Sequence, residues 1–63
     1  MTQKELSYVE DVIGHLTNII SICNEMIKML TDEELITFIQ GEITKHTNNK
    51  QNLIDLLEVK VNG

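Results

Sequence analysis

Large apolar side chains recur along the first half of the chain at spacings that alternate between three and four residues. The series comprises Leu6, Val9, Ile13, Leu16, Ile20, Cys23, Ile27 and Leu30. This alternation is the a/d pattern of a helix that packs against other helices. Thr2, followed three residues later by Glu5, is a capping-box pattern that starts such a helix. The sequence therefore predicts a helix over about residues 3–29.

A second apolar row lies beside this series. Val12, Ile19 and Met26 repeat every seven residues, which widens the apolar stripe to about three positions in seven. A stripe of that width is typical of a helix in a bundle that contacts two neighbours. The first helix is therefore expected to need more than one packing partner.

A second start signal follows the first helix at once. Thr31 and Glu34 repeat the capping-box pattern, which predicts Thr31 as the N-cap of a helix over about residues 32–59. The turn is then confined to about residues 30–31, and a connection this short makes the two helices antiparallel. The predicted fold class is all-α: a single domain, residues 1–63, that forms an antiparallel two-helix hairpin.

The second predicted helix is apolar only near its ends. Between Gln40 and Asn52, Ile43 is the only large aliphatic residue. The polar run over residues 44–52 is expected to be a solvated face with a few buried members. The two helices therefore contribute unequally to the apolar surface of the hairpin.

Gly14 and Gly41 lie inside the predicted helices, where glycine costs about 1 kcal/mol relative to alanine. Either the glycines permit a close approach of the two helices, or they have no structural role. The first alternative places Gly14 near Asn49 and Gly41 near Ile22 of the opposite helix.

The size of the chain indicates that the hairpin does not act alone. It has 63 residues, of which 41% are hydrophobic, and one cysteine. A chain this short rarely stabilises itself without disulfides, a metal or oligomerisation. We expect an antiparallel four-helix bundle formed with a second copy, or packing against another helical protein. The predicted interface residues are Leu6, Val9, Ile13, Leu16, Ile20, Cys23, Ile27, Leu30, Ile39, Ile43, Leu53 and Leu57.

Charge and hydropathy exclude several partners. The formal net charge is −5, with five scattered lysines and no arginine. Nucleic-acid binding is therefore not expected, because it needs a basic surface. The N-terminus lacks the apolar core of a signal peptide, and no apolar run is long enough to span a bilayer. We expect a soluble cytoplasmic protein without membrane contact.

Two residues could carry metal chemistry. Glu42 and His46 lie four residues apart and share one helix face. They could bind a metal across a dimer, or they could form a polar layer by bonding to each other or to water. A metal site normally needs three or more ligands, so the polar layer is favoured and no metal or cofactor is predicted.

No catalytic residue is predicted, and the protein is not expected to be an enzyme. His15 is expected to be an exposed helical histidine, since nothing near it resembles an activated nucleophile with its base. Cys23 lies in the apolar series and is expected to be a small packing residue rather than a redox thiol. A further alternative is a small regulatory protein that docks a protein or RNA through a face containing His46, Asn49 and Lys50.

The chain resembles small clostridial and bacillar spore coat proteins of the coat F type. The matching residues are 2–6, Glu10, Asp11, 32–35, Phe38, 53–57, Asn62 and Gly63. The resemblance implies a ferritin-like helical hairpin with a structural or assembly role in a spore coat. The architecture is also similar to the RNA-binding hairpin dimers that control the copy number of colicin plasmids. Those proteins need a cationic face, which this chain lacks.

Ferritin-like proteins that bind metal carry a carboxylate in the first helix and Glu-x-x-His in the second. Aligned on this chain, the carboxylate position falls on Leu16 and the Glu-x-x-His pair falls on His46 and Asn49. An alignment on Glu42 puts Lys45 at the histidine position. The resemblance therefore supports the hairpin and a non-enzymatic role, and it argues against a diiron site.

Overall fold

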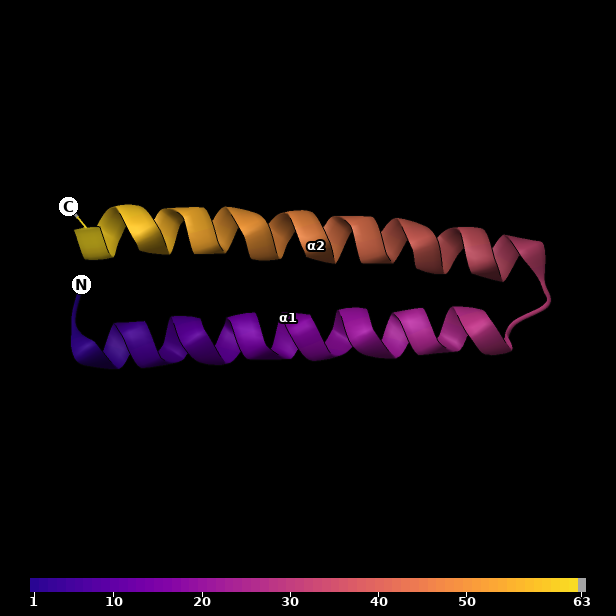
Figure 1. Cartoon of the computed structure of the whole chain (residues 1–63), viewed down its shortest axis with the longest axis horizontal. Helices are drawn as coiled ribbons and strands as arrows, with labels where there is room; N and C mark the ends of the chain where they lie inside the picture. The colour runs from indigo at the N-terminus through magenta and orange to yellow at the C-terminus, as the bar shows by residue number, and fades with distance from the viewer. Residues whose placement is uncertain (63) are drawn as a thin grey trace.

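The computed structural model describes residues 1–62 and contains two helices, α1 (Gln3–Met29) and α2 (Glu33–Asn62). They run antiparallel and side by side, so that both termini lie at the end opposite the turn (Figure 1). The predicted all-α hairpin is confirmed. The molecule is elongated, with extents of 46 × 15 × 11 Å.

The bounds of α1 agree with the prediction, whereas α2 is three residues longer at its end than the predicted 59. The extra turn lies beside the start of α1. Lys60 and Val61 line a common pocket with Leu6 and residues 1–3. Helix α2 continues through Asn62, and Gly63 lies outside the described residues.

The start of α1 is a complete capping box. The backbone N–H of Thr2 donates to the Glu5 carboxylate at 2.8 Å, and the backbone N–H of Glu5 donates to the Thr2 hydroxyl at 3.1 Å. Two N–H groups that the helix leaves unpaired at this end are thereby satisfied. The predicted start of the first helix is confirmed.

The start of α2 differs from the prediction by one residue. The carboxylate of Asp32, not Thr31, accepts the backbone N–H groups of Glu34 at 2.9 Å and Leu35 at 3.2 Å. Asp32 directly precedes the first helical residue, Glu33, and its carboxylate also places negative charge at the positive end of the helix. The predicted N-cap at Thr31 is therefore wrong.

The two helices meet along what we call the inner seam. On α1 the seam is the predicted apolar series from Leu6 to Leu30, and every member is half-buried. On α2 it consists of Ile36, Ile39, Ile43, His46, Lys50, Leu53 and Leu57, which are also half-buried. No described residue is fully buried. A single hairpin therefore shields its seam from one direction only.

Neither glycine marks a close approach of the helices. A Cβ atom added to Gly14 or Gly41 would meet no other heavy atom within 4 Å, apart from the helix's own backbone. Neither residue has a positive φ angle. Of the two alternatives, the structure supports the one in which these glycines have no structural role.

Candidate interaction face

In the Glu42–His46 pair of α2, His46 belongs to the inner seam and Glu42 lies beside it. Nε2 of His46 is 3.5 Å from Oε2 of Glu42, and both side chains are half-buried. Nδ1 of His46 is buried and has no hydrogen-bond partner among the described residues. The two side chains thus share one face, as predicted, with part of the imidazole's hydrogen-bonding capacity unused.

This pair does not make a metal site within one molecule. Within residues 1–62, no three His, Cys, Asp or Glu side chains lie together where they could hold an ion. Each copy supplies two donors, whereas a zinc site takes three or four. A metal bound here would therefore need ligands from a second molecule.

The other residues considered from the sequence fall in different places. His46 and Lys50 lie in the inner seam, whereas Asn49 is exposed beside it. His15 is exposed, as predicted. Cys23 is half-buried in the seam rather than fully buried, because only α2 covers it.

The outer side of α1 carries a second stripe of side chains, which we call the α1 outer stripe. Its members are Tyr8, Val12, His15, Ile19, Ile22, Met26 and Met29. Their spacing alternates between four and three residues, so they form one row about a quarter-turn from the inner seam. All seven are exposed in the hairpin, with Ile22 at 59% and Met29 at 76% of full exposure.

A matching row, the α2 outer stripe, runs along the second helix. Its members are Leu35, Phe38, Glu42, Lys45, Asn49, Asn52, Leu56 and Val59. The spacing again alternates between three and four residues. Phe38 is 64% exposed, and Glu42 is the one half-buried member. The stripe is apolar at both ends and polar in its middle.

The two outer stripes lie on the same side of the hairpin. Val12, Asn49 and Leu56 from the stripes line one open groove of about 470 Å³, with Leu16 and Leu53 of the inner seam at its base. We call the surface formed by both stripes the open face. Among residues 1–62, the exposed large apolar side chains all lie on it, except Met1 and Val61.

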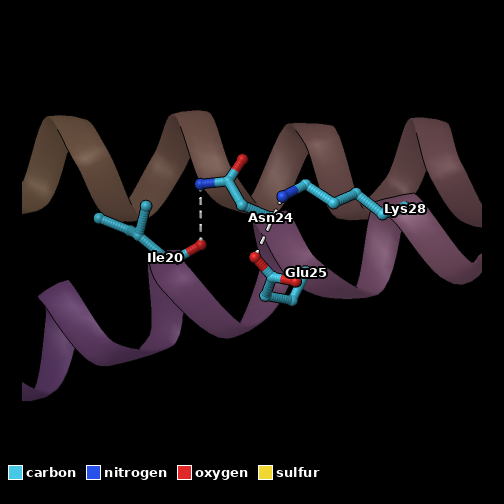
Figure 2. Close-up of polar contacts among 4 residues, drawn as sticks. All are labelled: Ile20, Asn24, Glu25 and Lys28. Atoms are coloured by element: carbon cyan, nitrogen blue, oxygen red, sulfur yellow. Dashed lines mark hydrogen bonds and ion pairs between the residues drawn. The ribbon is translucent and has the colours of Figure 1, made fainter.

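The rest of the α1 surface is polar. Figure 2 shows Asn24, whose amide donates to the carbonyl of Ile20 at 3.0 Å, and the ion pair between Lys28 and Glu25 at 3.1 Å. Both groups of this ion pair are well exposed, so it adds little to stability. Each turn of α1 therefore carries apolar side chains on one side and polar side chains on the other.

The sequence pattern predicts only part of the open face. Val12, Ile19 and Met26 form the predicted second row, which does not include Ile22 and Met29. The structure exposes both. The signal that could have found the face was the second heptad on each helix, shifted from the seam by the same amount.

Comparison with known proteins gives no relative for this chain: no family model, curated protein or solved structure matches it. Neither helix, within the described residues, is long and apolar enough to cross a membrane. The open face is thus the feature from which a function can be argued.

Proposed function

We propose that this hairpin is a non-enzymatic structural or assembly protein that works by pairing its open face with that of a second copy. The product is an antiparallel four-helix bundle. The observation that carries this proposal is the gathering of exposed apolar side chains on one side of an otherwise polar hairpin. Contiguous apolar surface of this kind marks interaction sites in soluble proteins.

The size of the open face suits a dimer. In the plane of its two helices the hairpin measures 46 Å by 15 Å. One face therefore projects about 700 Å² before the relief of side chains is counted, close to the ~800 Å² that each partner buries in a standard interface. Covering this face would also bury the half-exposed inner seam from a second direction.

The resemblance to coat F proteins supplies a biological setting for this assembly. A small hairpin that dimerises through one face can serve as a unit of a layered coat, with its polar side left for further contacts. Expression of the gene only in sporulating cells would support this setting. Expression restricted to vegetative growth would contradict the coat role but would not contradict the proposed dimer.

A matched pair of substitutions tests the dimer. Ile22 and Ser21 are neighbours on the same turn of α1 and both are exposed, but Ile22 lies on the open face and Ser21 lies on the polar side. Ile22→Glu should weaken self-association at least 100-fold, because it buries a carboxylate in an apolar interface. Ser21→Glu adds the same charge outside the interface and should leave association unchanged.

Sedimentation equilibrium over a range of protein concentrations measures the effect directly. We expect the native chain and Ser21→Glu to sediment as dimers at micromolar concentration, and Ile22→Glu as a monomer. A native chain that stays monomeric and fully helical at high micromolar concentration would overturn the proposal. Equal association by both variants would show that the dimer uses a different face.

A further inference from the structure

The α2 outer stripe has a polarity pattern that is the same in both directions. From the turn to the open end it comprises Leu35, Phe38, Glu42, Lys45, Asn49, Asn52, Leu56 and Val59. Two apolar positions are followed by four polar positions and then by two apolar positions. The midpoint of this pattern falls at residue 47.

The α1 outer stripe is apolar along its whole length apart from His15. Its midpoint lies at about Ile19. Leu16 shares a groove with Asn49 and Leu53, so Ile19, one turn nearer the hairpin turn, lies level with residue 47 of α2. The two stripes therefore have a common centre across the open face.

A second copy can cover the open face in two ways that preserve twofold symmetry. In the first, the turns of both copies lie at the same end, and α1 of each copy stacks on α2 of the other. In the second, the turns lie at opposite ends, and α1 stacks on α1 while α2 stacks on α2. Both arrangements make every neighbouring pair of helices antiparallel.

The same-end arrangement mismatches polarity. It places the apolar middle of one α1 outer stripe against the polar middle of the other copy's α2 outer stripe. Ile19 and Ile22 would then cover Glu42 and Lys45 without offering any hydrogen-bond partner. Burying charged groups under such conditions is unfavourable.

The opposite-end arrangement places apolar positions against apolar positions and polar positions against polar positions. Ile19 meets Ile19 of the other copy at the twofold axis, and the apolar ends of the α2 outer stripes meet each other. In the middle, Lys45 meets Asn49, whose amide oxygen can accept a hydrogen bond from the Lys45 ammonium group. Glu42 meets Asn52, whose amide nitrogen can donate to the carboxylate.

From this match we infer that the second copy docks with its turn at the opposite end. The four polar residues of each α2 outer stripe then pair across the twofold axis and fix the orientation and register of the dimer. Buried polar groups are known to specify register in helical assemblies at some cost in stability. This inference rests on the dimer proposed above and adds its arrangement.

Distances between spin labels distinguish the two arrangements. Cys23→Ala removes the native thiol, and Thr31→Cys then places one label in the turn of each copy. Opposite-end docking predicts a separation of roughly 46 Å, the length of the hairpin. Same-end docking predicts about 10–20 Å, since neighbouring helix axes lie 8–10 Å apart. Circular dichroism checks folding, and Cys23→Val replaces Cys23→Ala if helicity falls.

A second label separates failure of the arrangement from failure of the dimer. Asn48 is exposed near the middle of α2 and lies outside the outer stripe. Asn48→Cys labels should be less than about 40 Å apart in either arrangement, because the middle of each hairpin lies near the symmetry axis. A short distance at residue 31 with coupling at residue 48 would overturn the inferred orientation. No coupling at residue 48 would overturn the dimer itself.

Discussion

Nε2 of His46 lies 3.5 Å from the carboxylate of Glu42, one turn earlier on α2. This distance exceeds the 2.7–3.2 Å typical of N–H···O hydrogen bonds. Nδ1 on the other side of the ring is buried and has no hydrogen-bond partner within residues 1–62. His46 therefore fills a position of the inner seam with a side chain whose hydrogen bonds are poorly satisfied within the hairpin.

Replacing this histidine should stabilise the protein. His46→Leu puts an apolar side chain between Ile43 and Lys50 in the seam and removes a buried unsatisfied nitrogen. We expect the free energy of unfolding to rise by about 1 kcal/mol, at the low end of the cost of an unsatisfied buried group. Urea denaturation at fixed protein concentration measures it. His46→Gln keeps polar atoms at this position and should give no gain; a loss of stability in His46→Leu would show that the imidazole has a partner in the assembly.

The start of α2 offers a sharp comparison between neighbouring residues. Asp32 accepts two backbone N–H groups, so Asp32→Ala should lower the free energy of unfolding by about 1 kcal/mol. Thr31→Ala removes a side chain that does not cap the helix and should change it by less than about 0.5 kcal/mol. Thermal unfolding followed by circular dichroism compares the two variants. A larger loss of stability in Thr31→Ala than in Asp32→Ala would contradict this assignment and identify Thr31 as the N-cap.

The capping box at α1 makes stability depend on pH. Contacts with the backbone and then the side chain of Thr2 hold the pKa of Glu5 below its usual value of 4.5. Because the folded-state pKa is the lower one, the stabilisation is fully present above pH 4.5 and is lost as the pH falls through the folded-state pKa. Glu5→Gln, which does not titrate, should lose less stability than the native chain below pH 4.5. NMR titration of the Glu5 carboxyl carbon checks the direction of the shift, and a pKa at or above 4.5 would contradict it.

The sequence predicted the hairpin because its signals are local. The unbroken series from Leu6 to Leu30 defines one helix face, and the cap signals near residue 31 leave no room for a longer loop. The choice between Thr31 and Asp32 as the N-cap could not be made from the pattern. Both residue types cap helices, and the outcome depends on the backbone path that leaves Leu30 extended.

The open face was harder to foresee because it depends on how the helices are placed. Periodicity locates each outer stripe on its own helix, but only the structure shows that the groove at Val12 and Leu56 joins them on one side. The heptad repeat of the α2 outer stripe could not be recognised from apolar residues alone, because Glu42 and Asn49 in its middle are polar. Once the two outer stripes are aligned, this polar middle indicates which orientation of the second copy is favoured.

The two helical glycines give a way to strengthen the hairpin without touching its open face. A methyl group at Gly14 or Gly41 meets open space, and neither residue belongs to an outer stripe or to the inner seam. Gly14→Ala and Gly41→Ala should each raise the free energy of unfolding by about 0.5–1 kcal/mol, because alanine loses less backbone entropy in a helix than glycine does. Urea denaturation of the single and double variants measures the gains, which should add because the sites are far apart.

Sedimentation of the same glycine variants provides the control. The self-association constant measured among folded chains should match that of the native protein, since the added methyl groups lie outside the proposed interface. A variant that gains helicity but associates more weakly would place its glycine at a contact between copies. In that case the docking surface would extend beyond the open face, because a methyl group that meets nothing within one hairpin can clash only with a second molecule.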